Sequence, residues 1–252
     1  MNATKEKLTA GGSAVGGWIM TADATVAELM AGEAFDWICV DMEHTAADYA
    51  ALEHICRAVK ASGKEVFARL QGHDAVMAKK VLDMGCDGII VPCVNTREEA
   101  ERAVAMAKYP PAGIRGASLA RCTDYGRGFA RYFAEHNDNV LVAVMLEHVD
   151  AVTNVEEILS VEGIDATFIG PYDLSASMNL AGQLDHPEVR AAQNTLLQAC
   201  QRHGVAPGYH VVPTEPERVR VSIEEGFRFV ALGLDTRFII DGCRRMLEGV
   251  PR

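Results

Sequence analysis

The chain has 252 residues, 49% of them hydrophobic, so it is long enough to bury the core of one large α/β domain. Its formal net charge is −11, and the acidic excess is spread along the sequence, which argues against nucleic acid or an anionic membrane as a partner. No apolar run reaches the roughly 20 residues of a membrane span, and no signal-peptide pattern opens the chain. The seven cysteines include no C-x-x-C pair, which favours reduced thiols in a cytoplasmic protein.

Short apolar runs alternate with longer helical patterns along the whole sequence, and no linker divides them. We therefore predict a single domain over residues 1–252, with eight buried strands at residues 15–20, 37–41, 65–70, 88–92, 140–146, 166–169, 206–209 and 229–233. Eight strands with intervening helices predict a (β/α)₈ barrel. A doubly wound open sheet is the alternative, but the Gly-rich run at residues 11–17 lacks the order of a nucleotide-binding loop.

The predicted helices carry start and stop signals. Residues 96–99 form a capping box, and Pro110 follows the helix that they begin. A second helix begins near Pro187 and ends at Gly204. Residues 112–139 are predicted as the longest irregular section, and the arginines in this section indicate a functional loop or an interface.

Two of the predicted strands are followed by carboxylates. Glu147 closes the run at residues 140–146, and Asp173 comes just after residues 166–169. The carboxyl ends of parallel barrel strands form the catalytic rim, so this pair is expected to face it. Both residues offer hard oxygen ligands, which predicts a Mg²⁺ or Mn²⁺ site with open positions for water and substrate. The alternative is that each carboxylate caps the helix that follows it.

Three further strand ends carry polar side chains. The spacing of Asp41 and His44 allows a carboxylate to orient an imidazole that moves a proton, although a capping Asp beside an exposed His is equally consistent with it. Arg69 could hold a substrate oxygen that gains negative charge, or form an ion pair with Asp41 or Glu43. His210 either lines the same mouth or is a packed or surface histidine.

The motifs resemble those of the HpcH/HpaI aldolase family of metal-dependent class II pyruvate aldolases. They occur in the family's order and span nearly the whole chain, which makes chance a poor explanation. The matching segments are VDMEH at 40–44, Arg69, YPP at 109–111 with Gly113 and Arg115-Gly116, Glu147, EGID at 162–165, FIGPYDLS at 168–175, and Gly233 with Asp235-Thr236.

The resemblance implies a (β/α)₈ barrel whose last helix packs on a neighbouring subunit, in a homo-oligomer built from dimers and commonly a hexamer. It implies that Glu147 and Asp173 hold a divalent metal ion, Mg²⁺ or Mn²⁺ with Co²⁺ as a further candidate. It also implies that Arg69 holds the keto oxygen and that Asp41 and His44 form the acid/base dyad.

The implied reaction is the reversible aldol cleavage of a 4-hydroxy-2-oxo acid to pyruvate and an aldehyde. A base, His44 or a water that it activates, takes the proton of the C4 hydroxyl, and the C3–C4 bond breaks. The metal and Arg69 stabilise the pyruvate enolate that remains. The backbone around Gly170, Pro171 and Tyr172 is expected to bind the pyruvate carboxylate.

The sequence departs from the family pattern on the aldehyde side. Met145 stands where several catabolic members carry Gln, and His210 where they tend to carry an apolar side chain. The loop at residues 115–125 is shorter than theirs and contains Arg121. We therefore expect His210 and Arg121 to bind a polar aldehyde, such as a sugar acid or a hydroxy-aldehyde.

Two other functions remain open from the sequence. The same enolate could attack an acyl thioester in a Claisen-type condensation with a citrate-like product, although no nucleotide or pantetheine pocket is evident. The barrel could also bind a 2-oxo acid without catalysis. The joint presence of Asp41, His44 and Arg69 disfavours this last reading.

Overall fold

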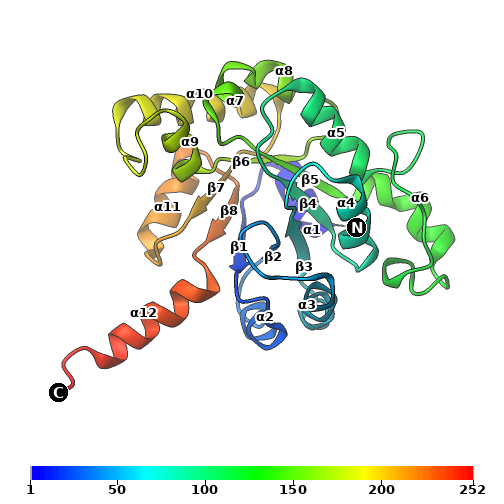
Figure 1. The fold of residues 1–252 in the computed structure, drawn as a ribbon, viewed down its shortest axis with the longest axis horizontal. Helices are drawn as coiled ribbons and strands as arrows, with labels where there is room; N and C mark the ends of the chain where they lie inside the picture. Colours follow the sequence, from blue (N-terminus) through cyan, green and yellow to red (C-terminus); the bar gives the residue numbers. More distant parts are fainter. Residues whose placement is uncertain (1, 252) are drawn as a thin grey trace.

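Eight parallel strands form the centre of the computed structural model, which describes residues 2–251 (Figure 1). They are β1 (Ala14–Ile19), β2 (Trp37–Asp41), β3 (Glu65–Arg69), β4 (Gly88–Val91), β5 (Leu141–Met145), β6 (Ala166–Phe168), β7 (Gly208–Val211) and β8 (Phe229–Leu232). They pair in the order β6-β5-β4-β3-β2-β1-β8-β7, and bridges from Ala166 to Ala206 and from Ile169 to Tyr209 join the two ends of this sheet. The predicted (β/α)₈ barrel is confirmed.

Helices cover the outside of the barrel (Figure 1). They are α1 (Ala3–Thr9), α2 (Ala24–Ala31), α3 (Tyr49–Ala61), α4 (Ala75–Asp83), α5 (Arg97–Ala107), α6 (Phe129–Asn139), α7 (Val149–Thr153), α8 (Val155–Leu159), α9 (Pro171–Ser177), α10 (Pro187–His203), α11 (Pro216–Glu225) and α12 (Asp235–Leu247), with a 3₁₀ turn η1 at Arg121–Thr123. The capping box at Thr96 and the Gly204 end of α10 are present as predicted. None of these helices has the length and apolarity that crossing a membrane requires, over the residues described.

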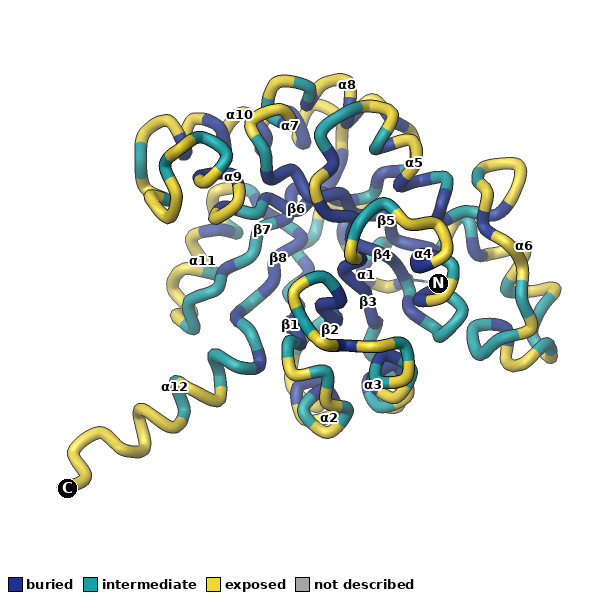
Figure 2. The backbone as a smooth tube through the Cα atoms, viewed as in Figure 1, coloured by how far each residue is buried: buried dark blue, intermediate teal, exposed yellow. Residues whose placement is uncertain are grey.

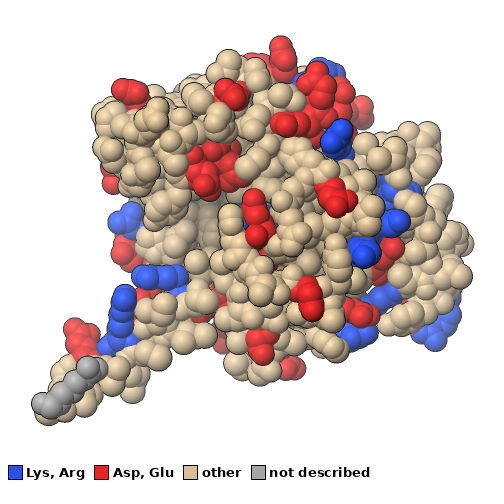
Figure 3. Space-filling model, in the orientation of Figure 1, with Lys and Arg blue, Asp and Glu red and all other residues tan. Residues whose placement is uncertain are grey.

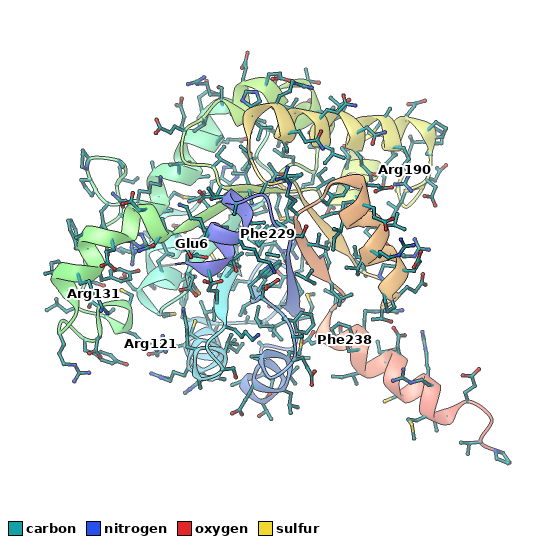
Figure 4. All side chains as sticks on the ribbon, turned by 180° about the vertical axis from the view of Figure 1, so that it is seen from behind. Glu6, Arg121, Arg131, Arg190, Phe229 and Phe238 are labelled. Atoms are coloured by element: carbon teal, nitrogen blue, oxygen red, sulfur yellow. The ribbon has the colours of Figure 1, made fainter. Side chains whose placement is uncertain are left out.

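The barrel interior is filled by aromatic side chains. Trp37 lies between Phe67 and Phe229, with ring centroids 5.6 Å and 4.5 Å away, and Phe168 stands edge-on to Phe229 at 5.2 Å (Figure 4 labels Phe229). Gly16 leaves room for this packing, since a Cβ there would lie 2.0 Å from the Trp37 ring. The interior is therefore a packed core, and chemistry is confined to the rim above it.

The N-terminal rim of the barrel repeats one arrangement three times. An Asp just before β2, β4 and β6 accepts a hydrogen bond, at 2.8 Å, from the second N–H of the strand preceding it in the chain. Each of these carboxylates also pairs with a lysine. The residues are Asp36 with Lys7, Asp87 with Lys60, and Asp165 with Lys5. The acidic groups of this rim are therefore locally neutralised.

Two of the predicted boundaries are wrong. β7 spans Gly208–Val211 instead of residues 206–209, because Ala206 makes only an isolated bridge to β6. The irregular section predicted for residues 112–139 contains helix α6, which begins at Phe129 without a side-chain cap. Phe133 of this helix stacks on Tyr109 at 4.5 Å, so tertiary packing supports a helix that lacks the usual start signal.

Helix α12 extends away from the barrel, and most of its length is exposed (Figures 1 and 2). Its start is fixed by Asp235, whose carboxylate accepts hydrogen bonds from the backbone N–H groups of Met20 and Thr21, both at 2.9 Å. Further along, Ile239, Met246 and Leu247 are 52%, 76% and 51% exposed. Packing of this helix on a neighbouring subunit stays a prediction.

Candidate active site

Strand register places Arg69 beside Asp41 at the C-terminal rim. The two residues are direct partners between β2 and β3, and the Arg69 guanidinium donates through Nε and Nη2 to both Asp41 carboxylate oxygens. Trp18 completes this unit by donating its indole N–H to Asp41 at 3.2 Å. Burial opposes ionisation of Asp41, but the hydrogen bonds and charge of Arg69 outweigh it and lower the pKa of this carboxyl. Asp41 is therefore an ionised anchor that fixes the orientation of Arg69.

The carboxylate beside the His44 ring belongs to Glu43 and not, as the sequence suggested, to Asp41. Asp41 accepts hydrogen bonds from the backbone N–H groups of Glu43 and His44 and does not contact the imidazole. The His44 ring instead lies 3.6 Å from the Glu43 carboxylate, which also lies 3.3 Å from Nη1 of Arg69. The expectation that Asp41 orients the His44 ring directly is thus corrected: the link runs from Asp41 through Arg69 and Glu43 to His44.

Glu147 lies just past β5 and is 4% exposed. Its Oε1 accepts hydrogen bonds from the backbone N–H of Cys93 at 2.9 Å and from the Cys93 thiol at 3.4 Å. Its Oε2 lies against Gly170, where a Cβ would come within 2.4 Å. Glycine at this position therefore leaves space for Oε2, and no donor within residues 2–251 binds that oxygen.

Asp173 lies in the first turn of α9, and its carboxylate does not cap the helix. Helix α7, which follows Glu147, is capped by the side chain of His148 instead. The ion pairs of this rim connect Arg69, Asp41, Glu43 and His44. Neither carboxylate therefore caps a helix, and the helix-capping alternative is wrong for both. Within residues 2–251, no ion pair includes Glu147 or Asp173 either.

The C-terminal rim carries excess negative charge. Burial raises the pKa of Glu147, and the nearby charges of Asp173 and Glu43 raise it further. Burial likewise raises the pKa of Glu43, with Asp41 and Asp173 adding to the shift. Figure 3 shows acidic side chains beside the hollow on this face of the molecule. Glu147 is the buried member of this group, whereas Glu43 is partly buried and Asp173 is exposed. Repulsion between Glu147 and its acidic neighbours is relieved when a cation binds beside it.

The donor set fits a hard divalent cation with few protein ligands. No cluster of three or more His, Cys, Asp or Glu side chains with the geometry to hold a metal ion occurs in the described part of the chain. Two carboxylates, Glu147 and Asp173, would thus leave several positions to water and substrate, which is the arrangement that Mg²⁺ commonly adopts. A zinc-type cage of nitrogen and sulfur ligands does not fit this rim.

His210 lies on β7 beside the same unit. Its ring centroid is 4.8 Å from that of Trp18 and 6.5 Å from that of Phe168. With Pro171 and Tyr172 it also lines a cavity of about 500 Å³ that extends between the α9–α10 connection and α11. The predicted substrate residues Gly170, Pro171 and Tyr172 form the start of α9, directly before Asp173.

Arg121 does not join this group. Its guanidinium donates to the backbone oxygen of Met84 at 3.2 Å, at the end of α4. Figure 4 shows Arg121 on the opposite side of the barrel from Arg190, which lines the cavity at His210. The single chain does not bring Arg121 together with His210, because the loop folds back onto α4, and the role of Arg121 in binding the aldehyde stays a prediction.

Two residues of the site had no assigned role from the sequence. Glu43 appeared only as a possible ion-pair partner of Arg69, although its place in the VDMEH motif was a usable signal. Cys93 lies beyond β4 with a positive φ of 51° and donates to Glu147 through both its N–H and its thiol. Cys93 is exposed at the rim, whereas Cys39 and Cys86 are buried.

The parallel barrel, with carboxylates, Arg69 and His44 gathered at its C-terminal rim, is the arrangement of a barrel enzyme. Residues 15–242 match the family model described as HpcH/HpaI aldolase/citrate lyase. The chain belongs to this family and is a carbon–carbon lyase.

Curated relatives and known structures agree with this assignment. The chain is 38% identical over 247 residues to the 4-hydroxy-2-oxo-heptane-1,7-dioate aldolase of Salmonella paratyphi C (strain RKS4594), covering 97% of this chain and 93% of the relative. Among crystal structures, an HpcH/HpaI aldolase/citrate lyase family protein from Burkholderia cenocepacia J2315 superposes with a TM-score of 0.93 at 30% identity, covering 99% of both chains. Citrate synthase SbnG superposes with a TM-score of 0.84 at 28% identity, covering 96% of this chain and 95% of the other.

Proposed function

We propose that this protein is a class II aldolase that cleaves a 4-hydroxy-2-oxo acid reversibly to pyruvate and an aldehyde, with Mg²⁺ or Mn²⁺ bound by Glu147 and Asp173. The observation that carries the proposal is the state of these two carboxylates. They lie at the C-terminal rim, form no ion pair with a basic side chain within residues 2–251 and cap no helix. When bound there, a divalent cation would act as a Lewis acid on the keto group of the substrate.

Arg69 supplies positive charge for the oxygen that gains negative charge as the C3–C4 bond breaks. Its Nε and Nη2 are engaged by Asp41, so Nη1 is the nitrogen free to turn from Glu43 to a substrate oxygen. The bidentate pair with Asp41 holds the guanidinium in place before substrate arrives, which lowers the cost of reorganisation in the transition state.

His44 is the proposed base, acting directly or through water. Its side chain is 58% exposed, so it can reach the C4 hydroxyl of a bound substrate, and Glu43 lies 3.6 Å from its ring. A carboxylate at this position favours the imidazolium that forms when the base accepts the proton. At the start of α9 the backbone N–H groups of Gly170 and Tyr172 are suited to the pyruvate carboxylate, while Pro171, which has no N–H, fixes the turn between them.

The active form is proposed to be a homo-oligomer built from dimers. The exposed apolar side chains of α12, with Ile239 and Leu247 both about half exposed, suit burial against a second copy. Light scattering on the full chain tests this, and a monomer at micromolar concentration would contradict it.

A Claisen-type condensation with an acyl thioester is the second candidate. The similarity to citrate synthase SbnG favours it. A citrate-like product would form when the enolate of the thioester adds to the keto carbon of a 2-oxo acid, whose oxygen Arg69 could then hold. The cavity beside His210 has charged walls that include Arg190 and Arg218. Release of free thiol from an acyl thioester, in the presence of a 2-oxo acid, distinguishes this reaction from aldol cleavage.

The cleavage reaction is tested with 4-hydroxy-2-oxoheptane-1,7-dioate, the compound in the relatives' name. Purified protein with Mn²⁺ is expected to release pyruvate, and EDTA or Glu147→Gln is expected to stop the release. The matched control is Asp165→Asn, which removes a carboxylate from the N-terminal rim and leaves the C-terminal rim intact. Pyruvate release that persists in both EDTA and Glu147→Gln would contradict the proposal.

A further inference from the structure

We propose that His210 determines which aldehyde the enzyme accepts, by taking a hydrogen bond at Nδ1 from a hydroxyl group of that aldehyde. The inference rests on the aldolase reaction proposed above and specifies its substrate class. The aldehyde product carries a hydroxyl group, so the 2-oxo acid that is cleaved has a second hydroxyl group in addition to the one on C4.

A backbone carbonyl fixes the tautomer of His210. Nε2 lies 2.9 Å from the Gly233 oxygen, just beyond β8. A carbonyl oxygen only accepts hydrogen bonds, so Nε2 must carry the hydrogen of this contact. The neutral ring then has its lone pair on Nδ1, and His210 presents an acceptor to whatever lies on that side.

The Nδ1 atom is free to meet a ligand. Within residues 2–251, no donor forms a hydrogen bond to Nδ1. The atom is also absent from the fully buried polar atoms without a partner, so it is accessible to solvent. The His210 residue as a whole is partly exposed and lines the cavity of about 500 Å³ together with Tyr172. An exposed acceptor beside a cavity can exchange its water for a substrate hydroxyl at little cost.

The ring also stands close to the reacting groups. Trp18 stacks on His210 at 4.8 Å and lies under the Arg69 guanidinium, which is 5.2 Å from the indole centroid. The same indole binds Asp41. Trp18 thus contacts both His210 and Arg69, so a substrate whose keto oxygen reaches Arg69 binds on the same rim as His210.

The charge state of His210 selects between polar ligands. Burial lowers the pKa of His210 to about 4, and the nearby Arg69 charge also lowers it, so the ring is neutral at physiological pH. A neutral ring that presents a lone pair attracts a hydroxyl and disfavours a carboxylate in the same position. A hydroxy-aldehyde fits this site better than an aldehyde with an acidic group at that carbon.

The test compares glycolaldehyde with acetaldehyde, which differ by one hydroxyl, as acceptors for pyruvate. The kcat/KM ratio of the two is measured for the wild-type protein, for His210→Leu and for His210→Gln, which keeps an acceptor oxygen. We expect the wild type to prefer glycolaldehyde. In His210→Leu the ratio of kcat/KM for glycolaldehyde to that for acetaldehyde should fall at least tenfold, and in His210→Gln it should recover in part. A tenfold change corresponds to about 1.4 kcal/mol, the scale of one hydrogen bond.

Three results would overturn the inference in different ways. An unchanged ratio in His210→Leu, with its melting temperature near that of the wild type, contradicts the role of His210 and leaves the aldolase proposal standing. Failure of the wild-type protein to exchange the methyl protons of pyruvate under any metal contradicts the aldolase proposal and the inference with it. A loss of equal size with both aldehydes indicates a packing role and also contradicts the inference.

Discussion

The two rims of the barrel differ in whether their acidic side chains have basic partners. At the N-terminal rim, Asp36, Asp87 and Asp165 each pair with a lysine and accept a strand N–H. At the C-terminal rim, Glu147 and Asp173 have no basic partner within residues 2–251. Burial and neighbouring acids raise the pKa of Glu147 there, a cost that folding alone does not explain. Carboxylates that pair with a lysine stabilise the barrel. Carboxylates without a basic partner indicate where a ligand supplies positive charge.

Removing an uncompensated carboxylate is expected to give the largest effect. Glu147→Gln and Asp173→Asn should each weaken Mn²⁺ binding by at least about 100-fold and abolish turnover, because the cation loses one of only two protein ligands. Titration of Mn²⁺ followed by electron paramagnetic resonance measures the affinity. Asp165→Asn is the matched control, and equal Mn²⁺ affinity in all three variants would remove the distinction between the rims.

Arg69→Lys is expected to lower kcat by about 10² to 10³ while the protein stays folded. Lysine keeps the charge but cannot bind both oxygens of Asp41 and still present a nitrogen to substrate. Steady-state kinetics measure the effect, with circular dichroism as the check on folding. A kcat within threefold of the wild type would show that charge alone is sufficient at this position.

Substitutions at the N-terminal rim are expected to lower the stability of the fold and to leave metal binding unchanged. Asp87→Asn removes the ion pair with Lys60 and weakens the hydrogen bond to the N–H of Val66. We expect a loss of about 1–3 kcal/mol in the free energy of unfolding, measured by urea denaturation. The Mn²⁺ affinity should not change. A variant of unchanged stability with impaired metal binding would reverse the roles of the two rims.

His136 gives a pH dependence that originates on the N-terminal side of the barrel. Burial, and then the charge of Arg115, lower the pKa of His136 to about 3, whereas the unfolded chain takes up this proton near pH 6.5. Between these values the unfolded state binds more protons, so the free energy of unfolding falls as the pH falls. From pH 7 to pH 5 the expected contribution is about 2 kcal/mol. Urea denaturation at both pH values should show a smaller loss for His136→Gln, and an equal loss would contradict the assignment.

Cys93 is expected to give the smallest effect. Cys93→Ala removes the thiol donor to Glu147 but keeps the backbone N–H that binds the same oxygen. We expect Mn²⁺ affinity to change by a few-fold at most, since the thiol is a weak donor. Cys93→Ser, which restores a donor, should bind Mn²⁺ as the wild type does. A large and unrescued loss would mean that the thiol itself binds the cation.

The sequence predicted the barrel and its acidic pair because both are local signals. Buried parallel strands appear as continuous apolar runs, and Glu147 and Asp173 follow two of them directly. Helix α6 was missed because it begins without a side-chain cap and depends on contact with Tyr109. Packing between distant segments leaves little trace in a local pattern.

The connections among Asp41, Arg69, Glu43 and His44 required the structure. The spacing of Asp41 and His44 suggested direct contact, but the register of β2 against β3 aligns Asp41 with Arg69. Asp41 then has no free oxygen for the imidazole, and Glu43 takes that position. The position of Arg121 likewise required the structure, because the direction of a loop depends on what it packs against, here α4.

The most direct test is the exchange of the methyl protons of pyruvate in D₂O, followed by NMR without any aldehyde. Exchange is expected with Mg²⁺ or Mn²⁺, to stop on addition of EDTA, and to be absent in Glu147→Gln while it persists in Asp165→Asn. That result would establish enolate formation at the C-terminal rim. No exchange with any divalent metal, or exchange that survives in Glu147→Gln, would contradict a cation-assisted enolate at this rim.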